Sequence, residues 1–156
     1  MRQAQVDHAD VKIAPPVLLF IHLLAAFLLH WVLPLPLPFP RFLVWIGYAL
    51  VIIGLMLPVS AANQFMQAHT TLDPHGSVKE VVTSGPYKLS RNPIYLGFVC
   101  LLIGFTFIFK TCWGLILSPL FLVLLNMLVV KHEEVYLEKK FGDRYTSYKA
   151  HVRRWL

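Results

Sequence analysis

Long apolar blocks alternate with shorter polar segments along the chain. The blocks comprise residues 16–33, 42–62, 94–109 and 113–130. A helix needs ~20 apolar residues to cross the hydrocarbon core of a bilayer, with a range of about 17–25. The pattern therefore predicts an all-α, polytopic membrane protein. We expect one domain over residues 1–156, with four transmembrane helices and a C-terminal helical region.

The connections between the blocks differ in character. The segment "LPLPLPFPR" (33–41) alternates proline with other residues and predicts a short extended connection. Residues 110–112, "KTC", predict a tight hairpin between the third and fourth helices. The segment 63–92 is long and carries scattered apolar residues, which favours an ordered functional loop.

After the fourth block the chain becomes charged without a helix breaker. No proline or glycine occurs over 131–141, so the last span should continue as a helix beyond the membrane. Gly142 then suits a helix C-terminus, and Asp143 suits the N-cap of a second helix. That helix should lie on the membrane surface or fold over the mouth of a site. Its apolar face, at helical spacing, consists of Tyr145, Tyr148, Val152 and Trp155.

Composition and charge agree with a membrane location and give an orientation. Charged residues make up 14% of the chain and hydrophobic residues 57%, whereas soluble domains contain about 25% charged residues. Apart from Arg41 and Lys110, the basic residues fall in the two termini and the 63–93 connection. Both termini and that connection should therefore face the cytoplasm. In a prokaryote this membrane would be the inner membrane. The net charge of +6 then reflects contact with anionic membrane lipids, and no nucleic-acid module is present.

Several kinds of site are excluded by the motifs. The stretch "HEEVY" (132–136) has Tyr136 where a zinc protease has its second histidine. Cys100 and Cys112 provide neither a disulfide framework nor a metal-ligand spacing, so no metal is expected. His22 and His30 lie in the first block without a nearby carboxylate, which favours packing roles.

The polar stretch before the third block is the best candidate for chemistry. Asn92 and Pro93 are typical of a helix start, and a helix N-terminus also offers free N–H groups to an anion. Arg91 lies just outside that start, where it could either extend to the interface or take part in a site. Glu133 and Glu134 lie where the last helix leaves the membrane, as a solvated face or as paired functional groups.

Together, "VVTSGPYKLSRNPIYLG" and "EEVYLEKKFGDRYTSYKAHVRRWL" resemble the isoprenylcysteine carboxyl methyltransferase and phospholipid methyltransferase superfamily. The resemblance covers roughly 78–156, half of the chain. It implies a membrane enzyme that uses S-adenosylmethionine, releases S-adenosylhomocysteine and methylates a small or lipophilic acceptor on the cytoplasmic side. The cofactor region would comprise about 78–97 and 131–156.

The resemblance also implies roles for individual residues. Arg91 and Glu134 match motif positions near the reactive end and would be catalytic. Glu133 would hold the amino group of the cofactor. The remaining cofactor-binding residues would be Val81, Val82, Tyr87, Asn92, Pro93, Ile94 and Tyr95.

Three departures from the family pattern bear on the substrate. Asn92 replaces the usual histidine and cannot become cationic. The terminal segment "VRRWL" lacks the two prolines of the family's "VPxxxP". Val129 occupies the position of a basic residue in prenylcysteine enzymes, so a prenylcysteine substrate is not indicated; Arg153 or Arg154 could supply a substitute charge. Two alternatives are an NADPH-dependent membrane reductase of sterol-reductase type and a non-catalytic membrane subunit.

Overall fold

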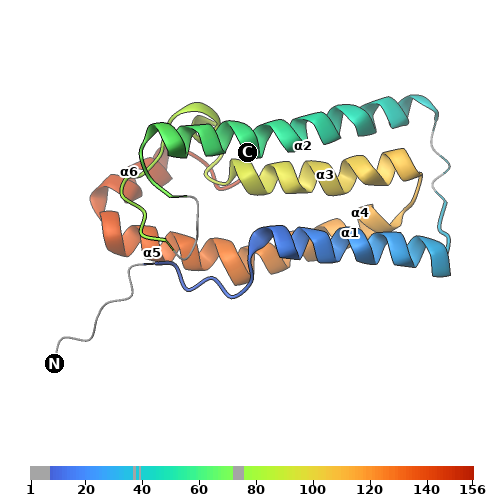
Figure 1. Cartoon of the computed structure of the whole chain (residues 1–156), viewed down its shortest axis with the longest axis horizontal. Helices are drawn as coiled ribbons and strands as arrows, with labels where there is room; N and C mark the ends of the chain where they lie inside the picture. Colours follow the sequence, from blue (N-terminus) through green and yellow to red (C-terminus); the bar gives the residue numbers. More distant parts are fainter. Residues whose placement is uncertain (1–7, 37, 39, 72–75) are drawn as a thin grey trace.

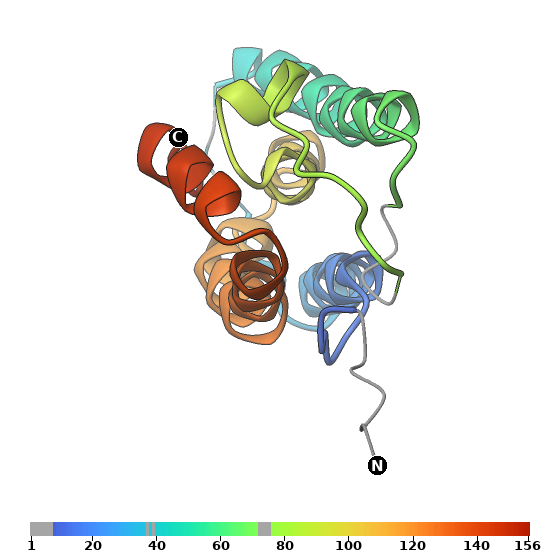
Figure 2. The ribbon, with the colours of Figure 1, turned by 90° about the vertical axis from the view of Figure 1, so that its left-hand side faces the viewer.

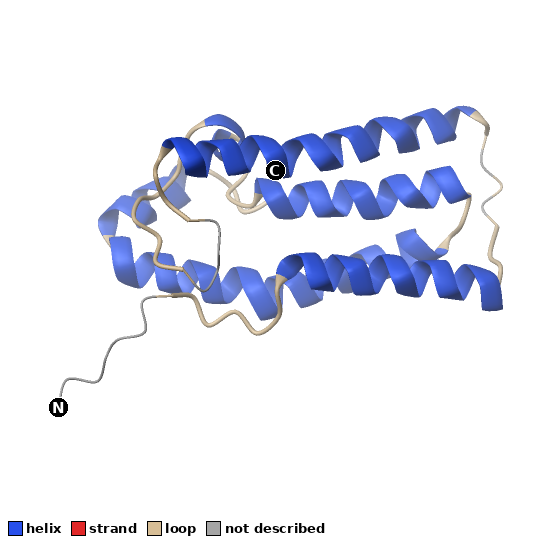
Figure 3. Ribbon diagram, in the orientation of Figure 1, coloured by secondary structure: helices blue, strands red, loops and turns tan. Residues whose placement is uncertain are grey.

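The computed structural model describes residues 8–36, 38, 40–71 and 76–156, and these form helices joined by loops, with no strand (Figures 1 and 3). The prediction of an all-α fold is confirmed. The long helices are α1 (Pro15–Val32), α2 (Phe42–Gln67), α3 (Pro93–Phe109) and α4 (Trp113–Leu125). The remaining elements are the 3₁₀ turn η1 (Gly85–Lys88), the π-helical turn η2 (Asn126–Val130), α5 (Lys131–Phe141) and α6 (Asp143–His151).

Three helices are long and apolar enough to cross a membrane. They are α1, α2 and the continuous helix Trp113–Phe141, which joins α4, η2 and α5. The outer faces of α1 and α2 expose large apolar side chains such as Phe20, Trp45 and Met56. Soluble monomers rarely expose contiguous apolar patches of this kind. The chain is an integral membrane protein. The fourth predicted span, α3, is apolar but has 17 residues.

The α3 helix lies at the centre of the bundle, between α2 on one side and α4 on the other, with α1 beside α4 (Figure 2). The α2–α3 contact is close because Gly47 and Gly54 on α2 face Gly104 and Gly97 on α3. A Cβ atom on Gly54 would lie 2.8 Å from the Gly97 carbonyl oxygen, and one on Gly47 would lie 2.9 Å from the Gly104 carbonyl oxygen. Small residues allow this approach of helix backbones within a membrane.

The hydrophobic core occupies the middle of the bundle, where α1, α3, α4 and η2 meet. Its fully buried side chains are Leu102, Phe121, Leu125, Val129 and Val130. His22 is also buried there. Its Nδ1 lies 2.8 Å from the Leu18 carbonyl oxygen, and its ring meets Phe121 edge-on. These contacts agree with the packing role predicted for His22.

Most connections follow the sequence prediction. The hairpin after α3 is tight, because Lys110 adopts a left-handed conformation (φ 51°) and α4 begins at Trp113. The last span continues through η2 into α5 as expected. The loop after α2 is shorter than predicted because α2 extends to Gln67. Parts of two predicted loops, residues 37, 39 and 72–75, lie outside the described residues.

Two predictions for the C-terminal region are wrong. Asp143 is the first residue of α6, and Gly142 takes the N-cap position with φ 52°, a conformation that favours glycine. The helix ends at His151, so Val152 and Trp155 lie beyond it and do not share its face. Tyr145 and Tyr148 do lie on α6, which packs over the end of the bundle near α5.

Candidate functional site

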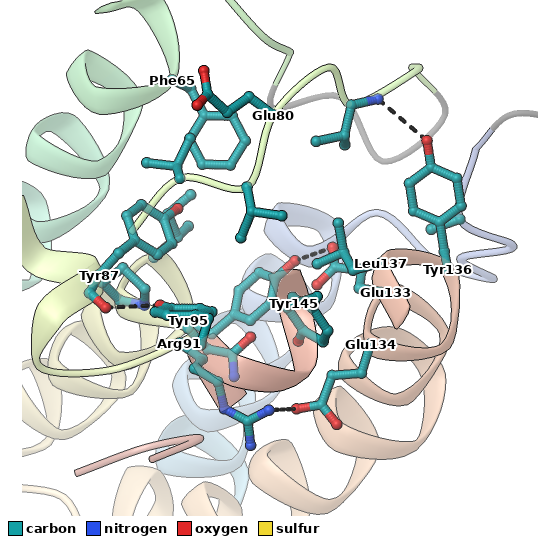
Figure 4. A pocket seen from close by; sticks show the side chains of 18 of the residues that line it. Phe65, Glu80, Tyr87, Arg91, Tyr95, Glu133, Glu134, Tyr136, Leu137 and Tyr145 are labelled. Atoms are coloured by element: carbon teal, nitrogen blue, oxygen red, sulfur yellow. Dashed lines mark hydrogen bonds and ion pairs between the residues drawn. The ribbon is translucent and has the colours of Figure 1, made fainter. Parts of the chain in front are cut away.

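A cavity of about 130 Å³ lies at the end of the bundle where α3 begins and α5 and α6 follow the last span (Figure 4). The loop after α2 and η1 form one wall, the first turn of α3 forms the floor, and α5 and α6 form the opposite wall. Its lining comprises Ala9, Phe65, Thr71, Val78, Glu80, Val81, Val82, Tyr87, Arg91, Asn92, Pro93, Ile94, Tyr95, Glu133, Glu134, Tyr136, Leu137, Tyr145 and Tyr148. We refer to it as the site cavity.

All ten site residues suggested by the sequence line the site cavity. They come from three segments of the chain: Val81, Val82, Tyr87 and Arg91 from the loop and η1, Asn92, Pro93, Ile94 and Tyr95 from the start of α3, and Glu133 and Glu134 from α5. The geometry brings these residues together. Their individual roles stay predictions.

One polar contact joins α3 to α5. The Tyr95 hydroxyl donates a hydrogen bond of 2.6 Å to Oε1 of Glu133. Tyr95 is buried at 9% exposure and packs against the core. Because Tyr95 lies in the first turn of α3, this bond fixes the position of α5 relative to the start of α3. The Glu133 carboxylate is thereby oriented at the cavity wall.

Glu134 lies between two arginines. Its Oε1 lies 3.0 Å from Nη1 of Arg91, and the two side chains are 10% and 9% exposed respectively. Arg154 donates from Nε to Oε1 at 3.0 Å and from Nη2 to Oε2 at 2.6 Å, a two-point contact. Nη1 of Arg154 also donates to Oδ1 of Asn126, in η2, at 3.1 Å. The Glu134 carboxylate therefore joins the two guanidinium groups and holds both in place.

The C-terminal residues 152–156, which we call the C-terminal strap, also bind the loop that leads into α3. The carbonyl oxygen of Arg153 accepts a hydrogen bond from the Arg91 backbone N–H at 3.0 Å. The carbonyl oxygen of Arg154 accepts bonds from Ser90 Oγ at 3.1 Å and from Asn92 Nδ2 at 3.0 Å. The strap therefore joins residues 90–92 to α5 behind the cavity.

This geometry bears on the interpretation of two residues. Asn92 occupies the N-cap position of α3 but makes no side-chain cap hydrogen bond, because its amide donates to the strap instead. The guanidinium group of Arg154 is paired with Glu134, and the substitution of Arg153 or Arg154 for the family's basic residue stays a prediction. The exposed Arg153 contributes its backbone carbonyl to the strap contact.

Aromatic residues that the sequence did not assign to the site close the cavity. The Tyr148 hydroxyl donates a 2.7 Å hydrogen bond to the carbonyl oxygen of Tyr87, which joins α6 to η1. The Phe65 ring lies 5.6 Å from the Tyr87 ring, between centroids. Burial raises the pKa of Tyr145 to about 12 and raises the pKa of Tyr87 further above its usual value. These hydroxyls stay protonated at neutral pH. The helical spacing of Tyr145 and Tyr148 was the feature of the sequence that could have indicated their place at the cavity.

The fold and the cavity define a helical membrane protein with a polar site at one end of its bundle. The model of the family described as "Phospholipid methyltransferase" matches residues 42–144, more than half of the chain. The chain therefore belongs to the phospholipid methyltransferase family, within the superfamily that its motifs resemble.

One curated relative and no solved structure accompany this family match. A protein of Haemophilus influenzae, described as an "Uncharacterized protein", is 36% identical to this chain over 63 residues. The aligned region is 40% of this chain and 100% of that protein. No solved structure matches the chain significantly. The family, rather than an individual relative, therefore carries the functional argument.

Proposed function

We propose that the protein transfers a methyl group from S-adenosylmethionine to a small or lipophilic acceptor at the cytoplasmic face of the membrane. The observation that carries this proposal is the convergence of Arg91, Glu133 and Glu134 with two aromatic walls around one cavity, in a chain of the phospholipid methyltransferase family. No single segment of the sequence contains this set of groups.

The cavity offers complementary partners for each part of the cofactor. The cofactor's ammonium group requires a carboxylate, which Glu133 provides from α5. Its carboxylate requires donors, which the uncapped N-terminus of α3 would provide. Its adenosine part fits the less polar side formed by Val81, Val82 and Tyr87.

The residues of this chain contribute orientation rather than acid–base chemistry. When bound, the cofactor supplies a methyl group that bonds to the acceptor atom as the carbon–sulfur bond breaks and its electron pair stays on sulfur. By the family resemblance Arg91 and Glu134 would lie beside this reactive end, and the C-terminal strap holds them through the Arg91 backbone N–H and the Glu134 carboxylate. Holding two reactants in line lowers the barrier mainly through orientation and the exclusion of water.

The cavity volume implies that a wall moves on binding. Ligand pockets usually measure about 300–1,000 Å³, and the site cavity measures about 130 Å³. Entry of the cofactor therefore requires the loop with η1, or α6, to move outward. The bond between Tyr148 and Tyr87 joins these two elements, so it would open and close with each binding event.

We further propose that α3 is a fourth transmembrane helix and that both termini face the cytoplasm. At 17 residues α3 meets the lower end of the spanning range of about 17–25. The concentration of basic residues in the termini and the 63–93 connection supports this orientation. The site cavity would then open at the interface, where a lipophilic acceptor reaches it from the bilayer and the polar cofactor from the cytosol.

Calorimetry on purified protein in detergent tests this function. We expect S-adenosylhomocysteine to bind with micromolar affinity, and Glu133→Ala to weaken that binding at least a hundredfold. Glu138→Ala is the matched control, because Glu138 lies on the same helix and contacts Lys149 instead of the cavity. Binding of NADPH in place of S-adenosylhomocysteine would indicate the reductase. Folded protein that binds neither compound would indicate a non-catalytic subunit.

A further inference from the structure

A second, larger cavity lies at the other end of the bundle from the site cavity. It measures about 660 Å³ and lies between α1 and α3, with the start of α4 as its floor. Its lining comprises Leu23, Ala26, Phe27, His30, Trp31, Pro34, Leu102, Phe105, Thr106, Phe109, Thr111 and Gly114. We call it the distal cavity. From it we infer a binding site for one acyl chain of a bilayer lipid, independent of the proposed methyl transfer.

The two cavities are separate. Between them lies the packed layer of the core, with Phe98, Leu102 and Phe121 each at most 9% exposed. Leu102 contacts the distal cavity, whereas Tyr95, about two helical turns earlier, contacts the site cavity. A molecule in the distal cavity therefore does not reach the site cavity through this layer.

The polarity of the lining changes along the cavity. Leu23, Ala26 and Leu102 form its deep, apolar part near the middle of the bundle. His30 and Thr111 lie close to the ends of α1 and α3, at the level where the chain leaves the membrane. An amphiphile would fit with its hydrocarbon chain inward and its polar group at the rim.

The polar rim has unused hydrogen-bonding capacity. Nδ1 of His30 is buried and has no hydrogen-bond partner among the described residues. A buried polar atom of this kind usually has a hydrogen-bond partner. The lack of a partner costs about 1–3 kcal/mol of free energy. An ester or hydroxyl group at the rim would supply one.

The length of the cavity matches one leaflet. Leu23 and Trp31 are separated by eight residues on α1, which at 1.5 Å per residue is about 12 Å. Half of a hydrocarbon core of ~30 Å is ~15 Å. The cavity thus extends from the interface to near the mid-plane, as one acyl chain does.

The exposure of the lining also favours an occupant from the membrane. Phe27, Trp31 and Phe109 are all more than half exposed, so the hollow opens at the surface of the bundle, and an empty hollow would lose dispersion contacts with its lining. Its walls come from α1 and the start of the Trp113–Phe141 helix, both long and apolar enough to cross a membrane, and from the apolar helix α3. Hydrocarbon chains would be the surrounding medium there. An acyl chain is therefore the molecule that fills this space with the smallest free-energy cost.

Photo-crosslinking in nanodiscs tests the site. The probe is a phosphatidylcholine with a diazirine in its acyl chain, and adducts are mapped by mass spectrometry. We expect adducts on the α1 and α3 residues of the distal cavity at several times the level on exposed α2 residues such as Trp45 and Met56. Ala26→Phe should fill the cavity and reduce these adducts at least fivefold.

Ala25→Phe is the matched control, because Ala25 neighbours Ala26 but does not line the distal cavity. It should leave the adducts within twofold of the wild type. If Ala26→Phe does not fold, Phe105→Trp tests the same cavity from α3. Equal labelling of wild type and filled variants would overturn the proposal.

Discussion

The site cavity and the distal cavity lie at the two ends of one bundle and differ in what holds their walls. Polar contacts join the walls of the site cavity: Tyr95 to Glu133, Tyr148 to Tyr87, and Arg91 to Glu134. The walls of the distal cavity are mostly apolar, and its His30 Nδ1 has no partner among the described residues. The first cavity measures about 130 Å³ and the second about 660 Å³.

This difference indicates that the two cavities would bind different kinds of ligand. Directional hydrogen bonds and ion pairs fix the positions of a few groups at the site cavity, so it suits a polar ligand of defined shape. Dispersion contacts have no preferred direction, so the distal cavity suits a flexible chain. The two cavities should therefore respond differently to substitution.

After Glu133→Ala, the largest expected effect comes from Arg154→Ala, which removes the guanidinium group that holds Glu134. Hydrogen bonds to charged groups contribute about 1.5–3 kcal/mol. We therefore expect S-adenosylhomocysteine to bind about tenfold to a hundredfold more weakly, as measured by calorimetry. Lipid crosslinking at the distal cavity should stay unchanged.

Two comparisons control this prediction. Arg153→Ala removes an equal charge whose side chain is exposed, and it should change the affinity less than twofold. Arg154→Lys keeps the positive charge but loses the planar guanidinium group, so it should retain only part of the affinity for S-adenosylhomocysteine. An Arg154→Ala variant with wild-type affinity would show that the strap does not position the site.

Gly54→Val tests whether both cavities depend on the α2–α3 contact, since α3 lines each of them. The new side chain would meet the Gly97 carbonyl oxygen and Leu101 at under 3 Å. Overpacking typically costs about 1–3 kcal/mol. We expect a lower thermal unfolding temperature in detergent. Ala49→Val on the exposed face of α2 should leave it unchanged, and equal stability of the two variants would contradict the close contact.

Tyr148→Phe should have a smaller effect, limited to the site cavity. It removes the hydroxyl that donates to the Tyr87 carbonyl oxygen, a bond with a net contribution of about 1 kcal/mol. We expect S-adenosylhomocysteine affinity to fall about fivefold, because α6 is no longer joined to η1. Tyr48→Phe on the exposed surface of α2 is the control. An unchanged affinity would mean that α6 closes the cavity by packing alone.

The smallest effect is expected from Ala26→Phe on the site cavity. Because the packed core layer separates the two cavities, S-adenosylhomocysteine affinity should stay within twofold of the wild type. Calorimetry on the variant used for crosslinking measures this directly. A tenfold change would show that the cavities are coupled through α3 and would remove the distinction between them.

Much of the fold could be predicted from the sequence because membrane helices are encoded locally. Proline at the first position begins α1 and α3, uninterrupted apolar runs form the spans, and Gly142 ends α5. The incorrect predictions concerned the ends of helices. α2 extends to Gln67, past the point where its apolar run weakens, and Asp143 enters α6 instead of capping it.

Candidate site residues could be named from the sequence because the family motifs lie in two short segments. The resemblance implied roles for residues in 81–95 and for the Glu133–Glu134 pair, and the fold brings these residues around one cavity. Their roles stay predictions. The strap could not be assigned in this way. Asn92 has the properties of an N-cap residue, and only the proximity of the Arg154 carbonyl oxygen directs its amide elsewhere.

The sequence by itself determined that this is a helical membrane protein of the phospholipid methyltransferase family, because apolar runs and short motifs depend on neighbouring residues alone. The tertiary structure decided that Arg154 holds Glu134, that α6 closes the site cavity, and that α1 and α3 leave a second cavity at the other end. Each of these depends on contacts between residues far apart in the chain. The distances between these residues are set by how the helices pack, and no local sequence pattern specifies that packing.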